Sequence, residues 1–426
     1  MTAEVAIVNT MAVALAADSA VTITLPTGET KIYNTVEKLF RLSEQQPIAL
    51  MVYGAGSFAS VSWELLAKQF RADNKDNTFI TVDECIAHFI DFLKRRTDIV
   101  SNAQRSNGIK LIMNNVFHSL QKEALSKFEE EDEFDDADVK HALTLVLEKE
   151  ISNLSGISFR NGESDETVES CKEQVSEIIP EVYSRYFDGL VDDVVHSKLV
   201  DFTGLYLAKG HQSLNVTGLV FAGFGSNEYV PNVKTLNFIG AINEHVIYNE
   251  VEGLSYSGLT PSSIIPFAQS DVLLSFIKGL SPTLNTSIES ITRESSVRVL
   301  DSVKEFLSTK GIQQQDIEDY SSELFGLLFE ERRRVLNDIT ASSNDKLVSP
   351  IIGMLSYLPK DELAKMAESL VNMTAFRRKV SNEDESVGGP IDVAVLTKND
   401  GFVWIKRKHY FPSNLNDHFF NNRCNN

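Results

Sequence analysis

A segment at the start of the chain decides the fold: it reads Thr2-Ala3-Glu4-Val5-Ala6-Ile7-Val8, then Met11-Ala12-Val13-Ala14-Leu15-Ala16-Ala17-Asp18-Ser19. Both parts are short apolar runs typical of β-strands, and Asn9-Thr10 separates them. A hairpin at this turn brings Asp18 back beside Thr2. We therefore expect a hairpin whose open end carries a hydroxyl and a carboxylate.

Thr2 follows the initiator methionine directly, and methionine is usually removed when a small residue comes next. Thr2 then becomes the first residue, with a hydroxyl nucleophile and an α-amine on the same residue. The amine can accept the proton of the hydroxyl, which is one way that proteins activate a nucleophile. Thr2 is therefore the first candidate catalytic residue.

The following segments alternate between strand-like and turn-like composition up to a helix. The expected order is a strand at 19–24, a turn at 25–30, a strand at 31–42, a strand at 48–53, Gly54-Ala55-Gly56, and a helix from Ser57 to Phe70.

This order resembles the N-terminal half of a proteasome β-type subunit, and is most similar to bacterial proteasome homologues of the Anbu type. The resemblance rests on Thr2, Ala16-Ala17-Asp18-Ser19, Thr35-Val36-Glu37-Lys38-Leu39 and Gly54-Ala55-Gly56. It implies that Thr2 is the nucleophile, that Asp18 orients and charges the catalytic lysine, and that Lys38 is that lysine. It also implies that the backbone N–H of Gly54 stabilises the oxyanion. Glu37 departs from the lysine usual at its position.

The C-terminal part of the chain carries a second match to the same family, in Asp384-Glu385-Ser386-Val387-Gly388-Gly389-Pro390. The resemblance makes Asp384 the aspartate that supports the nucleophile and Gly388-Gly389 the glycine pair before a strand. Val387 stands where a serine is usual. Ser257 is a further candidate for a supporting serine. Together the matches cover about residues 2–75, 215–265 and 375–411.

Each of these residues also has a purely structural interpretation. Asp18 is a plausible turn residue at a strand end, Lys38 a solvated charge, and Gly54 a bend between strand and helix. Their order along the chain together with Thr2 favours the catalytic interpretation.

Composition restricts the class of protein and of partner. The 426 residues are 42% hydrophobic, which is enough for a sizeable core, and the net charge of −20 argues against nucleic acid as the main partner. We expect no membrane span, because no apolar stretch approaches eighteen residues, and no basic, apolar signal at the N-terminus.

Cys85, Cys171 and Cys424 lack metal-ligand spacing and fit a cytoplasmic protein without disulfides. We expect no cofactor and no metal. The basic stretch Lys406-Arg407-Lys408-His409 is expected to be a solvated strand edge.

The region between the two matching blocks has helical periodicity. Helices are expected at Val82–Arg95, Ile109–Leu125, Val139–Leu154 and Val168–Leu190, and an acidic segment at 129–138 fits a solvated stretch better than a cation site. Strands return at Gly218–Phe224 and Val233–Ile239. A second helical stretch is expected over about 262–373, with helices at Ser287–Ser308, Ile317–Thr340 and Lys360–Met373.

These expectations combine into an α+β fold, a four-layer αββα sandwich of the N-terminal-nucleophile hydrolase type with an inserted helical region. Residues 1–75 and 213–411 would form the hydrolase domain, 76–212 the insertion, and 412–426 a polar tail. The expected activity is cleavage of peptide amide bonds through an acyl-enzyme on Thr2. Two alternatives stay open: an amidohydrolase acting on a small molecule, and a non-catalytic assembly protein. The resemblance also implies a homo-oligomer and an unfoldase or other regulatory partner.

Overall fold

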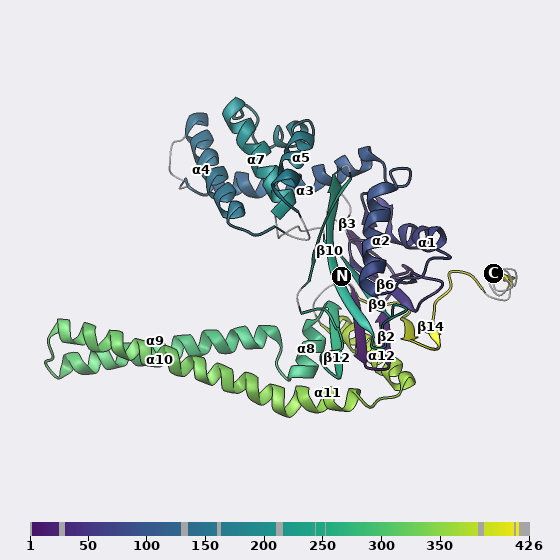
Figure 1. Ribbon diagram of the computed structural model, residues 1–426. Helices are drawn as coiled ribbons and strands as arrows, with labels where there is room; N and C mark the ends of the chain where they lie inside the picture. The colour runs from purple at the N-terminus through teal and green to yellow at the C-terminus, as the bar shows by residue number, and fades with distance from the viewer. Residues whose placement is uncertain are drawn as a thin grey trace. The chain divides into compact units, whose positions relative to one another are not determined.

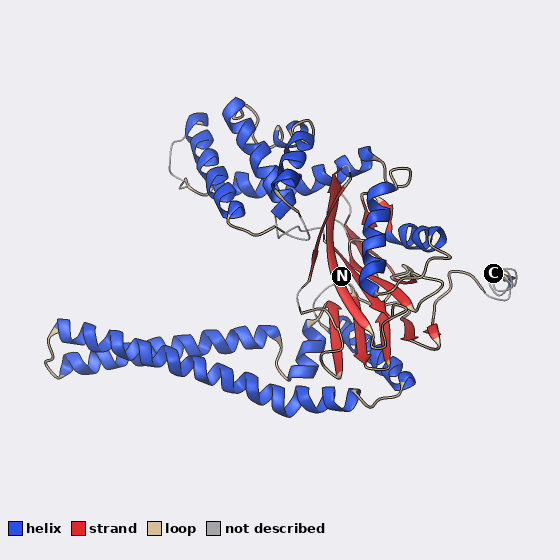
Figure 2. Cartoon of the chain, in the orientation of Figure 1, coloured by secondary structure: helices blue, strands red, loops and turns tan. Residues whose placement is uncertain are grey.

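The computed structural model describes residues 2–24, 30–128, 135–159, 163–209, 216–242, 244–251, 253–381, 387–412 and 415–416. The chain is a mixed α+β protein whose sheets are antiparallel, as the sequence predicts at this level (Figures 1 and 2). It divides into two compact units. Unit 1 comprises Met1–Val36, Gly258–Val395 and Trp404–Asn426, and unit 2 comprises Glu37–Ser257 and Leu396–Val403. No helix in the described ranges is both long enough and apolar enough to span a membrane.

The first five-stranded sheet has the strand order β12-β1-β2-β13-β14. Its strands are β1 (Ala3–Asn9), β2 (Ala12–Ala17), β12 (Ser262–Ala268), β13 (Asp392–Thr397) and β14 (Gly401–Lys406). β1 and β2 form the predicted hairpin, with Glu4 opposite Ala17 in the register. The segment that opens the chain therefore lies inside the sheet, between β12 and β13.

Asn9 holds the turn of this hairpin. Its side-chain oxygen accepts hydrogen bonds of 3.0 Å from the backbone N–H groups of Met11 and Ala12. Its amide nitrogen donates to the carbonyls of Leu355 and Leu358, each at 3.1 Å. An Asx turn of this kind is one reason why asparagine is frequent at tight turns. The same side chain also fastens the hairpin to the end of helix α11 (Ser349–Leu355).

Helix α12 (Lys360–Val380) covers one face of β1 and β2. Alternate residues of the two strands form an apolar cluster with this helix, as the period of two in a strand requires. The cluster includes Ala3, Val5, Ile7, Ala12, Ala14, Ala16, Leu363, Ala367, Leu370 and Val371. The intervening residues of both strands are buried as well, which explains why the strands read as continuous apolar runs.

Strand β12 corrects the sequence analysis, which placed residues from 262 onward in a helical stretch. Ser262–Ala268 pairs with β1 along its whole length, from Ala3 opposite Ala268 to Asn9 opposite Ser262. β-branched Ile264 and Ile265 favour an extended chain. Pro266 lacks an N–H and is tolerated because β12 is an edge strand of this sheet.

The second five-stranded sheet, in unit 2, has the order β11-β10-β9-β6-β5. Its strands are β5 (Leu39–Arg41), β6 (Ile48–Gly54), β9 (Thr217–Gly223), β10 (Asn232–Ile242) and β11 (His245–Glu250). Helices α1 (Trp63–Asp73) and α2 (Val82–Arg95) pack on it in an aromatic-rich core that includes Trp63, Phe70, Phe89 and Phe221. The sequence predicts α2 as part of the insertion, whereas the structure packs it with α1 and the sheet.

Two other expected elements differ from the structure. The segment 31–42 is not one strand: β4 (Thr30–Tyr33) pairs with β3 (Val21–Thr24), and β5 begins only at Leu39. The helix expected from Ser57 begins at Trp63, after a small hairpin of β7 (Ser57–Phe58) and β8 (Val61–Ser62). Ala59 and Ser60 form its turn with φ of +47° and +69°. Non-glycine residues seldom adopt this left-handed conformation, so composition did not reveal the turn.

Five further helices of unit 2 form a bundle with its own core. They are α3 (Asn102–Leu125), α4 (Asp136–Ser155), α5 (Asp165–Val175), α6 (Pro180–Tyr183) and α7 (Asp193–Lys209). The expected helix at Val168–Leu190 is broken, because Pro180 begins a new short helix. The core of the bundle also includes Ile242 and Ile247, from β10 and β11. Residues 129–134 of the acidic segment lie outside the described residues.

A pair of long antiparallel helices belongs to unit 1: α9 (Pro282–Thr309) and α10 (Gln314–Ser343) (Figure 1). α8 (Asp271–Lys278) precedes α9, and a short π-helical segment, Asn344–Val348, follows α10. The predicted helices at 287–308, 317–340 and 360–373 are confirmed, each somewhat longer than expected.

The basic stretch begins at Lys406, the last residue of β14, and is only partly solvated. Lys408 is largely buried and pairs with the carboxylate of Asp392, and Lys406 pairs with Glu368 at 2.5 Å. Arg407 lies over the ring of Trp404. The positive charges of this strand edge therefore have partners within unit 1.

Candidate functional site

Thr2 lies immediately before β1 and is fixed by backbone pairing on both sides. Its carbonyl accepts a hydrogen bond of 3.2 Å from the N–H of Gln269, just after β12. The carbonyl of Ala3 accepts one of 3.1 Å from the N–H of Asp18, just after β2. The side chain of Thr2 is buried. The three-strand pairing β12-β1-β2 therefore holds Thr2 beside Asp18, as the hairpin predicts.

The carboxylate of Asp18 is the centre of the site in unit 1. Its Oδ1 accepts a hydrogen bond of 2.6 Å from the hydroxyl of Thr2 and one of 3.2 Å from the N–H of Ala3. Its Oδ2 accepts from the N–H groups of Gly388, at 3.0 Å, and Ala20, at 3.3 Å. An ionised carboxylate can only accept, so these four donors suit it. Asp18 is thus positioned to orient the hydroxyl of Thr2.

The glycine pair of the C-terminal block lies against the same turn. Gly388 donates to Asp18, and its carbonyl accepts a hydrogen bond of 3.2 Å from the N–H of Ser19. The hydroxyl of Ser19 donates to the carbonyl of Pro390. Gly389 has φ of +77°, and a Cβ there would lie 2.8 Å from the Cβ of Asn34. Both sequence blocks that carry the resemblance therefore meet at Asp18 and Ser19.

Glu4 also contacts Thr2, and the sequence analysis did not identify it as a site residue. Its side chain is fully buried, and its Oε1 lies 3.1 Å from the hydroxyl oxygen of Thr2. One hydroxyl has one proton, so it donates to one of the two carboxylates at a time. The available signal was a lone acidic residue in an apolar strand, because a carboxylate is seldom buried without a specific use.

Lys38 and Gly54 belong to unit 2, where they lie at the neighbouring strands β5 and β6. Lys38 is buried just before β5, and its carbonyl accepts a hydrogen bond of 2.9 Å from the N–H of Val52 in β6. Gly54 ends β6 with φ of +82°, and a Cβ there would lie 2.4 Å from the carbonyl oxygen of Val216. The backbone therefore requires glycine at this position. The neighbouring Glu37 pairs with Lys68 at 3.1 Å.

The other two candidate site residues are Ser257 and Asp384. Ser257 is exposed, and it follows Tyr256, which bridges to Val233 in unit 2. Asp384 lies outside the described residues, as do its neighbours up to Ser386. Val387, the first described residue of the block, is buried in the cluster under α12.

Within the described ranges, no group of three or more histidine, cysteine, aspartate or glutamate side chains is placed to hold a metal ion. The two described cysteines are buried. Burial raises the pKa of the Cys171 thiol to about 12, with a smaller contribution from Glu163. It raises the pKa of the Cys85 thiol further. Neither thiol therefore offers a reactive thiolate near neutral pH.

The chain was compared with protein-family models and with curated proteins. No protein-family model matches this chain, and no curated protein matches it significantly in sequence.

Proposed function

We propose that this chain is an N-terminal-nucleophile hydrolase of the proteasome β-subunit kind, which cleaves peptide bonds with Thr2 after removal of Met1. The observation that carries the proposal is the hydrogen bond of 2.6 Å between the buried hydroxyl of Thr2 and Asp18. The resemblance assigns Thr2 as the nucleophile and Asp18 as the aspartate that orients Lys38, so the bond joins two of its assigned catalytic residues. The N–H of Gly388 on the same carboxylate adds support, because it comes from the second matching block.

The proposed chemistry follows from the groups on Thr2. The α-amine accepts the hydroxyl proton while Oγ1 attacks the carbonyl carbon of the substrate. The tetrahedral intermediate collapses when the amine returns this proton to the leaving nitrogen, and an ester on Thr2 remains. Water, deprotonated by the same amine, then hydrolyses the ester and restores the hydroxyl. Before the attack, the hydrogen bond to Asp18 holds the hydroxyl in one rotamer, and the proton turns from Asp18 to the amine as the reaction begins.

Lys38 and Gly54 have supporting roles in this proposal. The resemblance gives the ammonium group of Lys38 the role of stabilising the negative charge that develops on the nucleophile oxygen. The resemblance gives the backbone N–H of Gly54 the role of stabilising the oxyanion, a contribution worth about 3–4 kcal/mol where such a donor has been removed in other hydrolases. Asp384 and Ser257 remain proposed supporting residues on the resemblance alone.

The fold proposed with this function is the four-layer αββα sandwich. Each unit supplies features that support it. The sheet of unit 1 carries α12 on one face, and the sheet of unit 2 carries α1 and α2 on one face. In β1, β2, β6 and β9, most side chains on both faces of the sheet are buried. A sheet covered on one face only would leave the side chains of its other face exposed. A homo-oligomer and an unfoldase or regulatory partner belong to the same proposal.

A non-catalytic assembly protein is the second candidate. The observation that favours it is the crowding of Thr2: its hydroxyl contacts both Asp18 and Glu4, and its side chain is only 6% exposed. An amidohydrolase acting on a small molecule would use the same groups as the peptidase. Trapping the acyl-enzyme from a mixture of peptides and of small amides separates these two hydrolases.

The test is hydrolysis of a fluorogenic peptide library by the wild type and by Thr2→Ala, Thr2→Ser and Thr10→Ala. We expect no activity from Thr2→Ala, reduced activity from Thr2→Ser, which keeps a hydroxyl, and full activity from Thr10→Ala. Thr10 is the matched control, because it is exposed in the turn of the same hairpin. Full hydrolysis by Thr2→Ala would overturn the proposal.

A further inference from the structure

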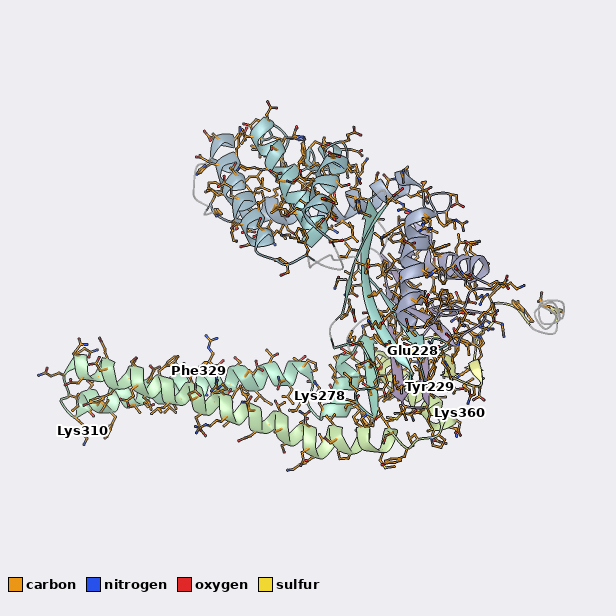
Figure 3. All side chains as sticks on the ribbon, viewed as in Figure 1. Glu228, Tyr229, Lys278, Lys310, Phe329 and Lys360 are labelled. Atoms are coloured by element: carbon orange, nitrogen blue, oxygen red, sulfur yellow. The ribbon has the colours of Figure 1, made fainter. Side chains whose placement is uncertain are left out.

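The helical pair α9–α10, called the arm below, exposes far more apolar surface than a helical hairpin needs. The 28-residue α9 is about 42 Å long at ~1.5 Å per residue. Lys310 lies at the tip, Phe329 partway along α10, and Lys278 at the base (Figure 3). The two helices pack chiefly on each other, with α8 and the π-helical segment at the base.

One stripe of each helix faces the other helix of the arm. These less exposed residues recur every three or four positions, as helix packing requires. In α9 they are Ile288, Thr292, Ser296, Leu300, Val303 and Leu307. In α10 they are Ile317, Ser321, Leu324, Leu328, Arg332, Leu336 and Ile339.

A second apolar stripe on each helix has no cover within the described residues. Its members are Leu284, Ile291, Val299 and Phe306 of α9, and Tyr320, Leu327 and Val335 of α10, between 40% and 63% exposed. Their spacing of seven or eight residues keeps each stripe on one face of its helix. We call these seven residues the apolar face of the arm.

The two stripes lie on the same side of the arm. Ile291, Val299 and Phe306 each come one position before an inward residue of α9. Tyr320, Leu327 and Val335 come one position before an inward residue of α10. In a pair of antiparallel right-handed helices, the residues that come one position before the contact residues lie on the same side of the pair in both helices. The opposite side carries the exposed Val297, Phe325 and Phe329, and Arg332 covers the ring of Phe329.

Seven exposed apolar side chains aligned on one side of the arm indicate a protein interface. The charged residues along the same stripe of α10 indicate what kind of partner binds the apolar face. Asp316 and Glu323 flank Tyr320 near the tip, at helical spacing, and Arg334 follows Leu327 by seven residues toward the base. Arg334 pairs with Glu331 at 3.3 Å but is 74% exposed, so the remaining N–H donors of its guanidinium can reach a partner.

We propose that the apolar face binds the same face of a second copy of this chain, with the two arms antiparallel. In that arrangement α10 lies over the α10 of the other copy, because a two-fold axis that lies in the contact plane and is perpendicular to the arm keeps like helices together. Asp316 then lies opposite Arg334 of the other copy when the two-fold axis passes near Phe325, midway between them in α10. The same axis places Arg334 opposite Asp316 of the other copy. Parallel arms would instead place α10 over α9 and separate these charges.

The first test compares Val299→Glu with Val297→Glu by light scattering across a concentration series. The two valines are 45% and 43% exposed on the same helix but lie on opposite sides of the arm, so each variant controls for the folding of the other. We expect Val299→Glu to weaken association at least about tenfold and Val297→Glu to leave it unchanged, because a charge is costly only where it becomes buried. Equal effects of the two variants, or a monomeric wild type, would refute the proposal.

The second test distinguishes a second copy from any other partner. Asp316→Lys and Arg334→Glu should each weaken self-association, because each puts like charges opposite one another. An equimolar mixture of the two variants should restore it, because the new lysine of one variant then faces the new glutamate of the other, and the unchanged Arg334 faces the unchanged Asp316. A mixture no stronger than its components contradicts the antiparallel pairing.

Crosslinking locates the contact if other surfaces also associate. With Cys424→Ser as background, Leu327→Cys should give a dimer with a short thiol crosslinker and Val297→Cys should not. Absence of the Leu327→Cys crosslink, or equal crosslinking at both sites, rules out this interface. Thr2→Ala should leave all three results unchanged, so a failure of the proposed hydrolase and a failure of the arm contact remain distinguishable.

Discussion

Single residues carry the site, and Asp18 is the most constrained of them. It accepts one hydroxyl and three backbone N–H hydrogen bonds, which tie together β1, the segment after β2, and Gly388. The hairpin periodicity was enough to predict that Asp18 returns to Thr2. Glu4 could not be identified in the same way, because alternation in a strand shows which face a side chain occupies but not which neighbour it contacts.

Replacing Asp18 by asparagine tests this network. The amide nitrogen of asparagine cannot accept, so at least one of the donors that face Asp18 loses its partner in Asp18→Asn. We expect the free energy of unfolding, measured with urea, to fall by about 1–3 kcal/mol. Asp91→Asn is the control. The side chain of Asp91 is half exposed, and its ion-pair partner among the described residues is the exposed Arg95, so a change below about 0.5 kcal/mol is expected there. Similar losses for both variants would mean that the network around Asp18 contributes little.

Gly54 and Gly56 form a second matched pair. Gly54→Ala forces a side chain into a left-handed backbone conformation and against the carbonyl of Val216, whereas a Cβ at Gly56 meets no atom within 4 Å. Strain of this kind costs about 1–3 kcal/mol. Thermal unfolding should therefore show a clear loss for Gly54→Ala and little change for Gly56→Ala. A neutral Gly54→Ala would show that β6 ends differently from the structure described here.

The thiols give a prediction about pH. Burial raises the pKa values of Cys85 and Cys171, so the thiolate, which is the reactive form, is scarce in the folded protein at pH 7–8. The raised pKa values mean that both thiols would ionise only well above this range. Mass-resolved alkylation at pH 8 should leave both unmodified in the native protein and modify both in urea. Rapid native labelling of either cysteine would show that its surroundings open readily.

At the scale of elements, sequence periodicity predicted the long helices well and the short strands less well. The helix expected at Val82–Arg95 matches α2 residue for residue, because its caps and apolar spacing agree. β12 was missed because its pairing with β1 joins residues more than 250 positions apart in sequence. The hairpin β7–β8 was missed because its turn uses left-handed alanine and serine.

Arg105 shows how a buried charge can join two elements. Its guanidinium donates to the carbonyls of Leu93, at 2.7 Å, and Val100, at 3.1 Å, near the end of α2 and just before α3. Burial lowers the pKa of Arg105, with Glu244 opposing the shift. Arg105→Met leaves these carbonyls without that donor, and we expect about 1–3 kcal/mol lower stability in urea unfolding. Arg95→Met, at an exposed site on α2, is the control, and an equal effect there would contradict the assigned role.

For the whole molecule, the organisation into discontinuous units was beyond sequence analysis. Unit 2 takes in the tip of the β13–β14 hairpin, where Lys398 donates to the carbonyls of Gly225, at 2.5 Å, and Ser226, at 2.7 Å. Composition changes along a chain cannot reveal such contacts, because they depend on which distant segments meet. The helical character of the region after α2 was predictable, whereas its shared core with β10 and β11 was not.

The central claim is that Thr2 becomes a free N-terminal nucleophile. Intact-mass spectrometry of the purified protein, with and without an electrophile that captures N-terminal threonine, tests it most directly. We expect loss of Met1 and a single adduct on Thr2, absent in Thr2→Ala and strongly reduced in Lys38→Ala. Retention of Met1 without any adduct would contradict it and would favour the assembly protein.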